Sequence, residues 1–176
     1  GDKSFITSGD HASGYVTTAV NRDNPDEISA FWIPRSTEGV RVGKAEDKMG
    51  LRASNTVQLY FEGAHVPKDH ILGGLGDGFL IAMSALNRGR VGVASQALGS
   101  AQSALAEALQ LAAKLPKSQT ARWKLADMVT EFETCLLLIE RAAMLNEREI
   151  DFREAASQAK VYVTEKAYII CQDLYT

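Results

Sequence analysis

The spacing of apolar residues changes along this chain of 176 residues, from the period of a strand to that of a helix. Before about residue 68, stretches rich in β-branched and aromatic residues alternate with turn-forming stretches. The clearest are GYVTTAV, EISAFWI and TVQLYFE. In the last of these, Val57, Leu59 and Phe61 alternate with polar neighbours, which predicts one buried and one wet face. This part is expected to form a small antiparallel sandwich or barrel.

From about residue 77, apolar residues recur at steps of three and four, as they do on one face of a helix. Three helices are predicted, with Gly89 as the place where the first could break. Their core positions are Phe79, Met83, Leu86, Val93, Ala97, Ala101, Leu105 and Ala108; Leu125, Met128, Phe132, Leu136, Ile139 and Ala143; and Ala156, Ala159, Val163, Ala167, Ile170 and Leu174. Short connections favour antiparallel packing. The sequence therefore predicts an α+β protein, with a β domain over 1–70 and an incomplete helical bundle over 71–176.

Composition argues against several classes of function. The net charge of −3 is unlike that of a nucleic-acid-binding surface. The longest apolar run, CLLLI, is far shorter than the roughly 20 residues that span a bilayer. Cys135 and Cys171 form no C-x-x-C pattern and are expected to be buried, in a reducing compartment. The three histidines are scattered, which argues against a metal site.

Two stretches carry side chains that composition alone does not explain. In SALNRGRVG, Asn87 and Arg90 lie three residues apart and so share a helix face, with Gly89 between them at a cost of about 1 kcal/mol relative to alanine. Such a pair is either a structural or solvated one, or a fixed positive charge that lines a ligand cleft. In SFITSG, Phe5 precedes Thr7 by two positions. This is either a strand end or an aromatic ring and a hydroxyl that cover a planar heterocycle.

Several segments taken together resemble the acyl-CoA dehydrogenase family. KSFITSG is similar to the family pattern K-x-[WF]-I-T-[NS]-G, and the stretch from ISAFWIPRS to PKDHILG is similar to its middle β-domain. GDGFLIAMSALNRGRVG resembles the opening of its C-terminal helical domain, and KLADM and EAASQAKVY follow in the family's order. The agreement extends over nearly the whole chain, which makes it specific.

The resemblance implies a flavoenzyme with FAD as its cofactor. Such an enzyme oxidises an acyl-CoA thioester to the trans-2-enoyl-CoA: a glutamate removes a proton from Cα, and a hydride passes from Cβ to flavin N5. The matching positions imply that Phe5, Ile6 and Thr7 bind the flavin ring, with the Thr7 hydroxyl bonded to N5. Gln119 is the remaining candidate for a flavin contact in a stretch, AAKLPKSQTARW, that departs from the family's R-x-x-F-G.

The substrate side of the implied site lies on the first predicted helix. Asn87 is implied to contact the CoA arm, and Arg90 to order the cleft and the catalytic base. Phe79 and Met83 are expected to line part of the acyl pocket. Gly89 stands where one branch of the family places its catalytic glutamate, so the base is expected beyond Thr176, which would leave the given chain without one. Elsewhere, the family has a strand and the residues LNG where this chain joins Asp2 to Lys3.

The same resemblance implies partners and leaves alternatives. An electron transfer flavoprotein is the expected electron acceptor, the expected assembly is a homotetramer, and both a bacterial cytoplasm and a mitochondrial matrix fit the sequence. Glu107, Glu131 and Glu140 are expected to be solvated ion-pair residues rather than bases. Two other functions stay open: an acyl-CoA oxidase that passes electrons to O₂, and a non-catalytic flavin- or DNA-binding relative.

Overall fold

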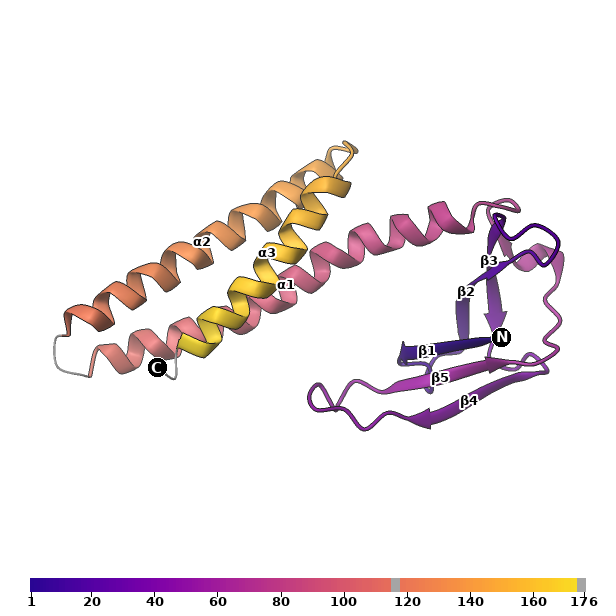
Figure 1. The fold of residues 1–176 in the computed structure, drawn as a ribbon, viewed down its shortest axis with the longest axis horizontal. Coiled ribbons are helices and arrows are strands. Elements are labelled where there is room, and N and C mark those ends of the chain that lie inside the picture. Colours follow the sequence, from indigo (N-terminus) through magenta and orange to yellow (C-terminus); the bar gives the residue numbers. More distant parts are fainter. Residues whose placement is uncertain (115–117, 174–176) are drawn as a thin grey trace. The chain divides into compact units, whose positions relative to one another are not determined.

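This computed structural model describes residues 1–114 and 118–173. Strands come first along the chain and helices follow (Figure 1). The strands are β1 (Asp2–Thr7), β2 (Gly14–Val20), β3 (Ile28–Pro34), β4 (Val40–Ala45), β5 (Thr56–Phe61) and β6 (Ile71–Leu72), with a short 3₁₀ turn, η1 (Lys68–His70), before β6. The helices are α1 (Gly78–Ala112), α2 (Gln119–Glu147) and α3 (Arg153–Asp173). The chain divides into two compact units, and the boundary lies within α1, between Met83 and Ser84.

The first unit contains two three-stranded antiparallel sheets, with the strand orders β1-β5-β4 and β2-β3-β6. The three strands predicted from the sequence are confirmed as β2, β3 and β5. Neither sheet continues its hydrogen-bond ladder into the other, so the described residues form no closed barrel, and the barrel alternative is wrong. The antiparallel α+β class is confirmed.

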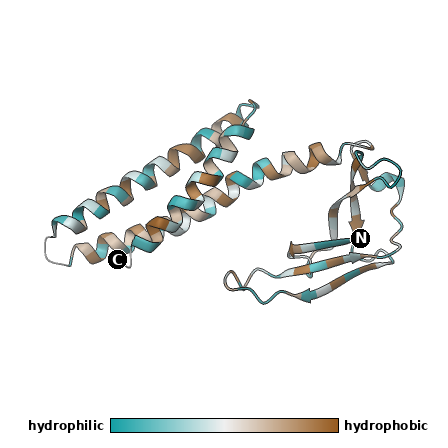
Figure 2. Ribbon diagram, in the orientation of Figure 1, coloured by the Kyte–Doolittle hydropathy of each residue, from teal (hydrophilic) through white to brown (hydrophobic). Residues whose placement is uncertain are grey.

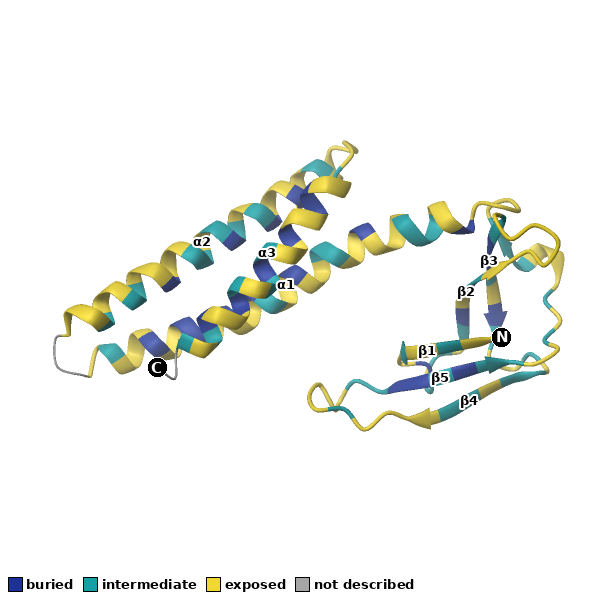
Figure 3. Ribbon diagram, viewed as in Figure 1, coloured by how far each residue is buried: buried dark blue, intermediate teal, exposed yellow. Residues whose placement is uncertain are grey.

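Side chains from both sheets share the core of the first unit. Val57 and Leu59 on β5 are buried and pack against Tyr15 of β2. Figure 3 shows the buried stretch along β5. The Tyr15 hydroxyl donates a hydrogen bond of 2.9 Å to the carbonyl oxygen of Gly9. Its ring meets that of Phe61 edge to face, with 6.3 Å between the ring centroids. The predicted buried face of β5 is therefore confirmed at Val57 and Leu59, whereas Phe61 and the two polar-face residues Gln58 and Tyr60 are all half-buried.

The glycine-rich stretch before α1 brings its backbone against β3. A Cβ at Gly78 would lie 2.5 Å from the carbonyl carbon of Ser29, so only glycine fits there. The Gly76 N–H donates to the Ser29 hydroxyl (3.0 Å), and the Gly74 N–H donates to the Asp77 carboxylate (2.7 Å). These bonds fix the place where α1 begins on the first unit.

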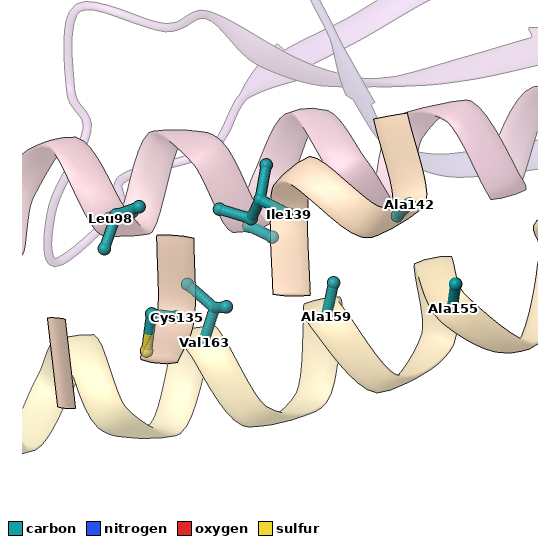
Figure 4. Packing of buried hydrophobic residues seen from close by; sticks show 8 residues of the cluster. Leu98, Cys135, Ile139, Ala142, Ala155, Ala159 and Val163 are labelled. Atoms are coloured by element: carbon teal, nitrogen blue, oxygen red, sulfur yellow. The ribbon is translucent and has the colours of Figure 1, made fainter. Parts of the chain in front are cut away.

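The second unit consists of three helices that run antiparallel to their sequence neighbours (Figure 1). Hydrophilic and hydrophobic residues alternate around α2 and α3, as is typical of amphipathic helices (Figure 2). Side chains from all three helices meet in an alanine-rich core (Figure 4). Its buried members are Ala94, Leu98, Cys135, Ile139, Ala142, Ala155, Ala159 and Val163.

The buried line of α1 differs from the predicted one. Helix α1 runs without a break through Gly89, so the possible interruption there is wrong. Ala101, Leu105 and Ala108 are buried as expected, whereas Leu86 and Val93 are exposed. Those two residues lie one position, about 100° around the helix, from the line that Asn87, Ala94 and Ala101 bury. In this part of α1 the smaller side chains of Asn87 and Ala94 face the core, and the larger ones of Leu86 and Val93 face outward.

Four smaller expectations about the helices have different outcomes. The predicted core position Ala143 is exposed, and its neighbour Ala142 is buried instead. Cys135 is buried and burial raises the pKa of its thiol, whereas Cys171 is only half-buried; both are free thiols. Leu174 lies outside the described residues. Among the described helices, none combines the length and apolar character that crossing a membrane requires.

Candidate functional site

Phe5 lies at a bulge in strand β1. The pairing with β5 runs from Lys3 opposite Leu59 to Ile6 opposite Val57, so β1 carries one residue more than its partner. Phe5 has a φ of 57°, a left-handed conformation that is uncommon for a bulky residue. Its side chain is 73% exposed. A bulge re-aims side chains locally, and here it holds Phe5 in a strained backbone conformation and presents its ring to solvent.

The neighbours of Phe5 divide between the core and the surface. Ile6 is half-buried and packs against the core of the first unit. Thr7 is exposed, and its hydroxyl has no hydrogen-bond partner among the residues that the structure describes. The bulge therefore puts an aromatic ring and an available hydroxyl on the surface of one strand end.

Two residues that the sequence analysis did not single out support this strand end. Ser8 also has a φ of 57°, and its N–H donates to the carbonyl oxygen of Asn55 over 2.8 Å. The Asn55 side-chain oxygen is buried and has no partner in the described part of the chain. Nothing in the sequence marks either residue, because the support comes from backbone groups of β1 and the loop before β5.

On α1, the structure brings Asn87 and Arg90 together. Nη1 of Arg90 donates to Oδ1 of Asn87 over 2.6 Å. Asn87 is only 7% exposed, and Arg90 is half-buried. Arg88 and Gly89, the other members of the polar cluster, are exposed. The cluster thus consists of one inward-facing pair and two outward-facing residues.

The other predicted site residues lie at separate places on the helices. Phe79 is exposed and Met83 is half-buried, both in the first two turns of α1. Gln119 is exposed and begins α2, next to the N-cap Ser118, whose hydroxyl accepts a hydrogen bond from the N–H of Ala121.

Glu131 belongs to a polar cluster between α2 and α3. Its carboxylate accepts a hydrogen bond of 2.8 Å from the Lys166 ammonium and one of 2.9 Å from the Tyr162 hydroxyl. These bonds, that from Lys166 first, lower the pKa of Glu131. A carboxylate held in its charged form is a poor proton acceptor, so the cluster is a structural clamp between the two helices. Glu107 and Glu140 are exposed.

A cavity of about 570 Å³ opens in the first unit. Thr17, Phe31, Ile33 and Phe61 are among the residues that line it. Phe5, Ile6 and Thr7 do not line this cavity. Residues 1–114 and 118–173 contain no group of three or more His, Cys, Asp or Glu that could hold a metal ion.

Two family models match the chain in the order of its two units. The model described as the acyl-CoA dehydrogenase middle domain matches residues 1–64, and the model described as the acyl-CoA dehydrogenase C-terminal domain matches residues 76–175. The second match alone covers more than half of the chain. The chain belongs to the acyl-CoA dehydrogenase family. The resemblance in its sequence motifs is thereby confirmed.

Individual relatives of this family member come from mitochondria and from bacteria. The short-chain specific acyl-CoA dehydrogenase of Rattus norvegicus mitochondria is 43% identical over 180 residues, which cover 97% of this chain and 43% of the relative. An acyl-CoA dehydrogenase of Bacillus subtilis is 42% identical over 178 residues, which cover 95% of this chain and 46% of the relative. The chain therefore spans less than half the length of these two relatives.

Solved structures agree with the fold. The butyryl-CoA dehydrogenase of Megasphaera elsdenii superposes with a TM-score of 0.93 at 36% identity, over 99% of this chain and 48% of that one. A chain from work on the electron transferring flavoprotein of Acidaminococcus fermentans superposes with a TM-score of 0.92 at 39% identity, over 99% of this chain and 48% of that one.

Proposed function

We propose that this protein is a flavin-dependent acyl-CoA dehydrogenase that oxidises a short-chain acyl-CoA to the trans-2-enoyl-CoA. A proton leaves Cα and a hydride leaves Cβ, so that a carbon–carbon double bond forms between them. The observation that carries the proposal is the bulge at Phe5, which presents an aromatic ring beside the unpartnered hydroxyl of Thr7 in a member of this family. The names of the short-chain and butyryl-CoA relatives support the choice of substrate length.

The residues of β1 fit a flavin ring on chemical grounds. A planar ring system stacks on an aromatic side chain, and the exposed Phe5 provides that surface. The Thr7 hydroxyl would donate a hydrogen bond to a ring nitrogen, and Ile6 anchors the strand in the core beneath. When bound, FAD supplies the acceptor for the hydride. Gln119, exposed at the start of α2, is proposed as a further flavin contact.

On α1, Arg90 would supply a fixed positive charge on the substrate side, and Phe79 and Met83 would contact the acyl group. A guanidinium stays charged at any pH that a protein tolerates, so Arg90 can stabilise negative charge without exchanging a proton itself. Glu131 is no candidate for the base, since Lys166 and Tyr162 hold it in its charged form.

An electron transfer flavoprotein is proposed as the partner that reoxidises the protein, and a homotetramer as its assembly. Apolar side chains exposed on the helical unit support association. They include Leu86, Val93, Val161, Tyr168 and Ile169. Light scattering on the purified protein tests the assembly, and a monomer at micromolar concentration would refute it.

The test of function is an anaerobic titration of the full-length protein. We expect a yellow protein whose visible flavin absorbance bleaches on addition of short-chain acyl-CoA and returns with an electron-accepting dye. Substrate-dependent hydrogen peroxide in air would instead support an oxidase. A protein that stays colourless after incubation with FAD would refute the proposal.

A further inference from the structure

The Asn87–Arg90 pair is closed within one turn of α1. The two side chains lie three residues apart, and 2.6 Å separates Nη1 of Arg90 from Oδ1 of Asn87. A guanidinium has only donors, so the amide must turn its oxygen, rather than its nitrogen, toward Arg90. The acceptor side of Asn87 is thus already used before any ligand binds.

Burial points the same way. Asn87 heads the buried line of α1, above Ala94, Leu98 and Ala101, and is the only buried polar residue of the helical unit within its described residues. A buried polar side chain is destabilising unless it is hydrogen-bonded. The bond from Arg90 gives the buried Asn87 a hydrogen-bond partner. The same bond holds the long Arg90 side chain in one orientation.

The charge of the acceptor distinguishes Arg90 from three arginines of the chain that form ion pairs. Arg35, Arg41 and Arg153 pair with the carboxylates of Asp10, Glu62 and Asp151, which neutralise them. Arg90 is bonded to a neutral amide, and no described carboxylate lies within ion-pair distance of it. Its geometry is fixed while its positive charge stays available.

We propose that Asn87 is a positioning residue for Arg90, and that the oriented Arg90 receives a group that carries or develops negative charge. This inference rests on the proposed function for the identity of the ligand, an acyl-CoA. It differs from a direct contact between Asn87 and the CoA arm, in which the amide nitrogen would donate to the ligand.

Two substitutions separate these roles. Asn87→Asp keeps an oxygen toward Arg90 and removes the N–H donors, whereas Asn87→Leu has similar size and offers neither. We expect Asn87→Leu to slow flavin reduction by acyl-CoA about tenfold or more, the usual worth of a hydrogen bond to a charged group. Asn87→Asp still orients Arg90 but pairs its guanidinium with a carboxylate, so it should also slow flavin reduction, while the guanidinium keeps its parent position. A rate within about threefold of the parent in Asn87→Leu would overturn the proposal.

A double-mutant cycle tests whether Asn87 acts only through Arg90. In an Arg90→Met background, whose side chain has no N–H donor, Asn87→Leu should slow flavin reduction by no more than about a further twofold, because the bond it removes is already absent. The affinity for the enoyl-CoA product is measured by calorimetry in the two single variants and the double variant. If the losses of affinity in the single variants add up in the double variant, Asn87 contacts the ligand itself and the inference is refuted.

A structural measurement keeps the inference independent of the proposed function. Crystal structures of the two Asn87 variants without ligand should show the Arg90 guanidinium in its parent position in Asn87→Asp and displaced in Asn87→Leu. An unmoved guanidinium in Asn87→Leu would refute the positioning role. If the parent protein fails to react with acyl-CoA while these structures are as expected, the proposed function fails and the positioning role stands.

Discussion

Replacing Phe5 by glycine and by alanine measures the backbone strain at the β1 bulge. With φ at 57°, an L-residue at this position carries roughly 1–2 kcal/mol of steric cost, which glycine avoids. Glycine in turn gains about 0.5–1 kcal/mol of unfolded-state entropy relative to alanine. The loss of the phenyl ring is common to both variants and cancels in the comparison. We therefore expect Phe5→Gly to be more stable than Phe5→Ala by about 0.5–1 kcal/mol.

Val16 provides the matched control. It is an exposed residue in the interior of β2, and it is not among the residues with positive φ. At this position the order should reverse, and Val16→Ala should be more stable than Val16→Gly by about 0.5–1 kcal/mol. The assay is guanidinium-induced unfolding of the flavin-free protein at one fixed concentration, compared at equal m-values.

Flavin binding supplies the functional half of the same experiment. Both Phe5 variants should lose flavin affinity, since the stacking surface is gone in each, whereas Phe5→Trp should retain it. If Phe5→Ala is as stable as Phe5→Gly or more stable, the reasoning is refuted, because the backbone at position 5 would then not be left-handed. Unchanged flavin affinity in Phe5→Ala would refute the assignment of the ring to the flavin.

Three further predictions concern single contacts. Thr7→Val removes a hydroxyl without a described partner, so the free energy of unfolding should change by less than about 0.5 kcal/mol. Flavin reduction, followed by stopped flow, should slow about tenfold. A normal rate would contradict the role of Thr7. Gly78→Ala places a Cβ 2.5 Å from a carbonyl carbon of β3 and should cost about 1–3 kcal/mol in denaturant unfolding, whereas Gly50→Ala, with nothing within 4 Å, should be neutral. The Lys166 hydrogen bond lowers the pKa of Glu131, so this carboxylate binds fewer protons in the folded state than in the unfolded state. The contribution of Glu131 to the free energy of unfolding is therefore lost as the pH falls below the ordinary pKa of 4.5. Glu131→Gln should flatten that part of the stability–pH curve, and an unchanged curve would count against the clamp.

The sequence predicted elements whose side-chain period is unambiguous. β5 alternates cleanly through Val57 and Leu59, and the helical spacing through Ala101, Leu105 and Ala108 matches the buried line. It did not predict which of two adjacent faces of α1 is buried near residue 90. Leu86 and Val93 are more apolar than Asn87 and Ala94, so hydrophobicity alone favours the wrong face. The three helices instead meet through alanines, whose small size permits close packing.

The candidate site divides in the same way. Motif resemblance predicted roles for Phe5, Thr7, Asn87 and Arg90, because each matches a family position that has a chemical role, and these roles stay predictions. The bulge at Phe5 was not predictable, since phenylalanine has no preference for positive φ, and the strain depends on pairing with a strand about fifty residues away. Nor was the orientation of Asn87, whose helical spacing allowed a ligand contact and a bond to Arg90 equally well.

The rate at which acyl-CoA reduces the bound flavin, followed anaerobically in the parent protein and in two variants, tests the account most directly. Thr7→Val changes the β unit and Arg90→Lys changes the helical unit, and the account assigns both residues to one reaction. We expect rapid bleaching in the parent and at least tenfold slower bleaching in each variant, with unfolding midpoints near that of the parent. Bleaching at the parental rate in either variant, or no bleaching in the parent, would contradict the account.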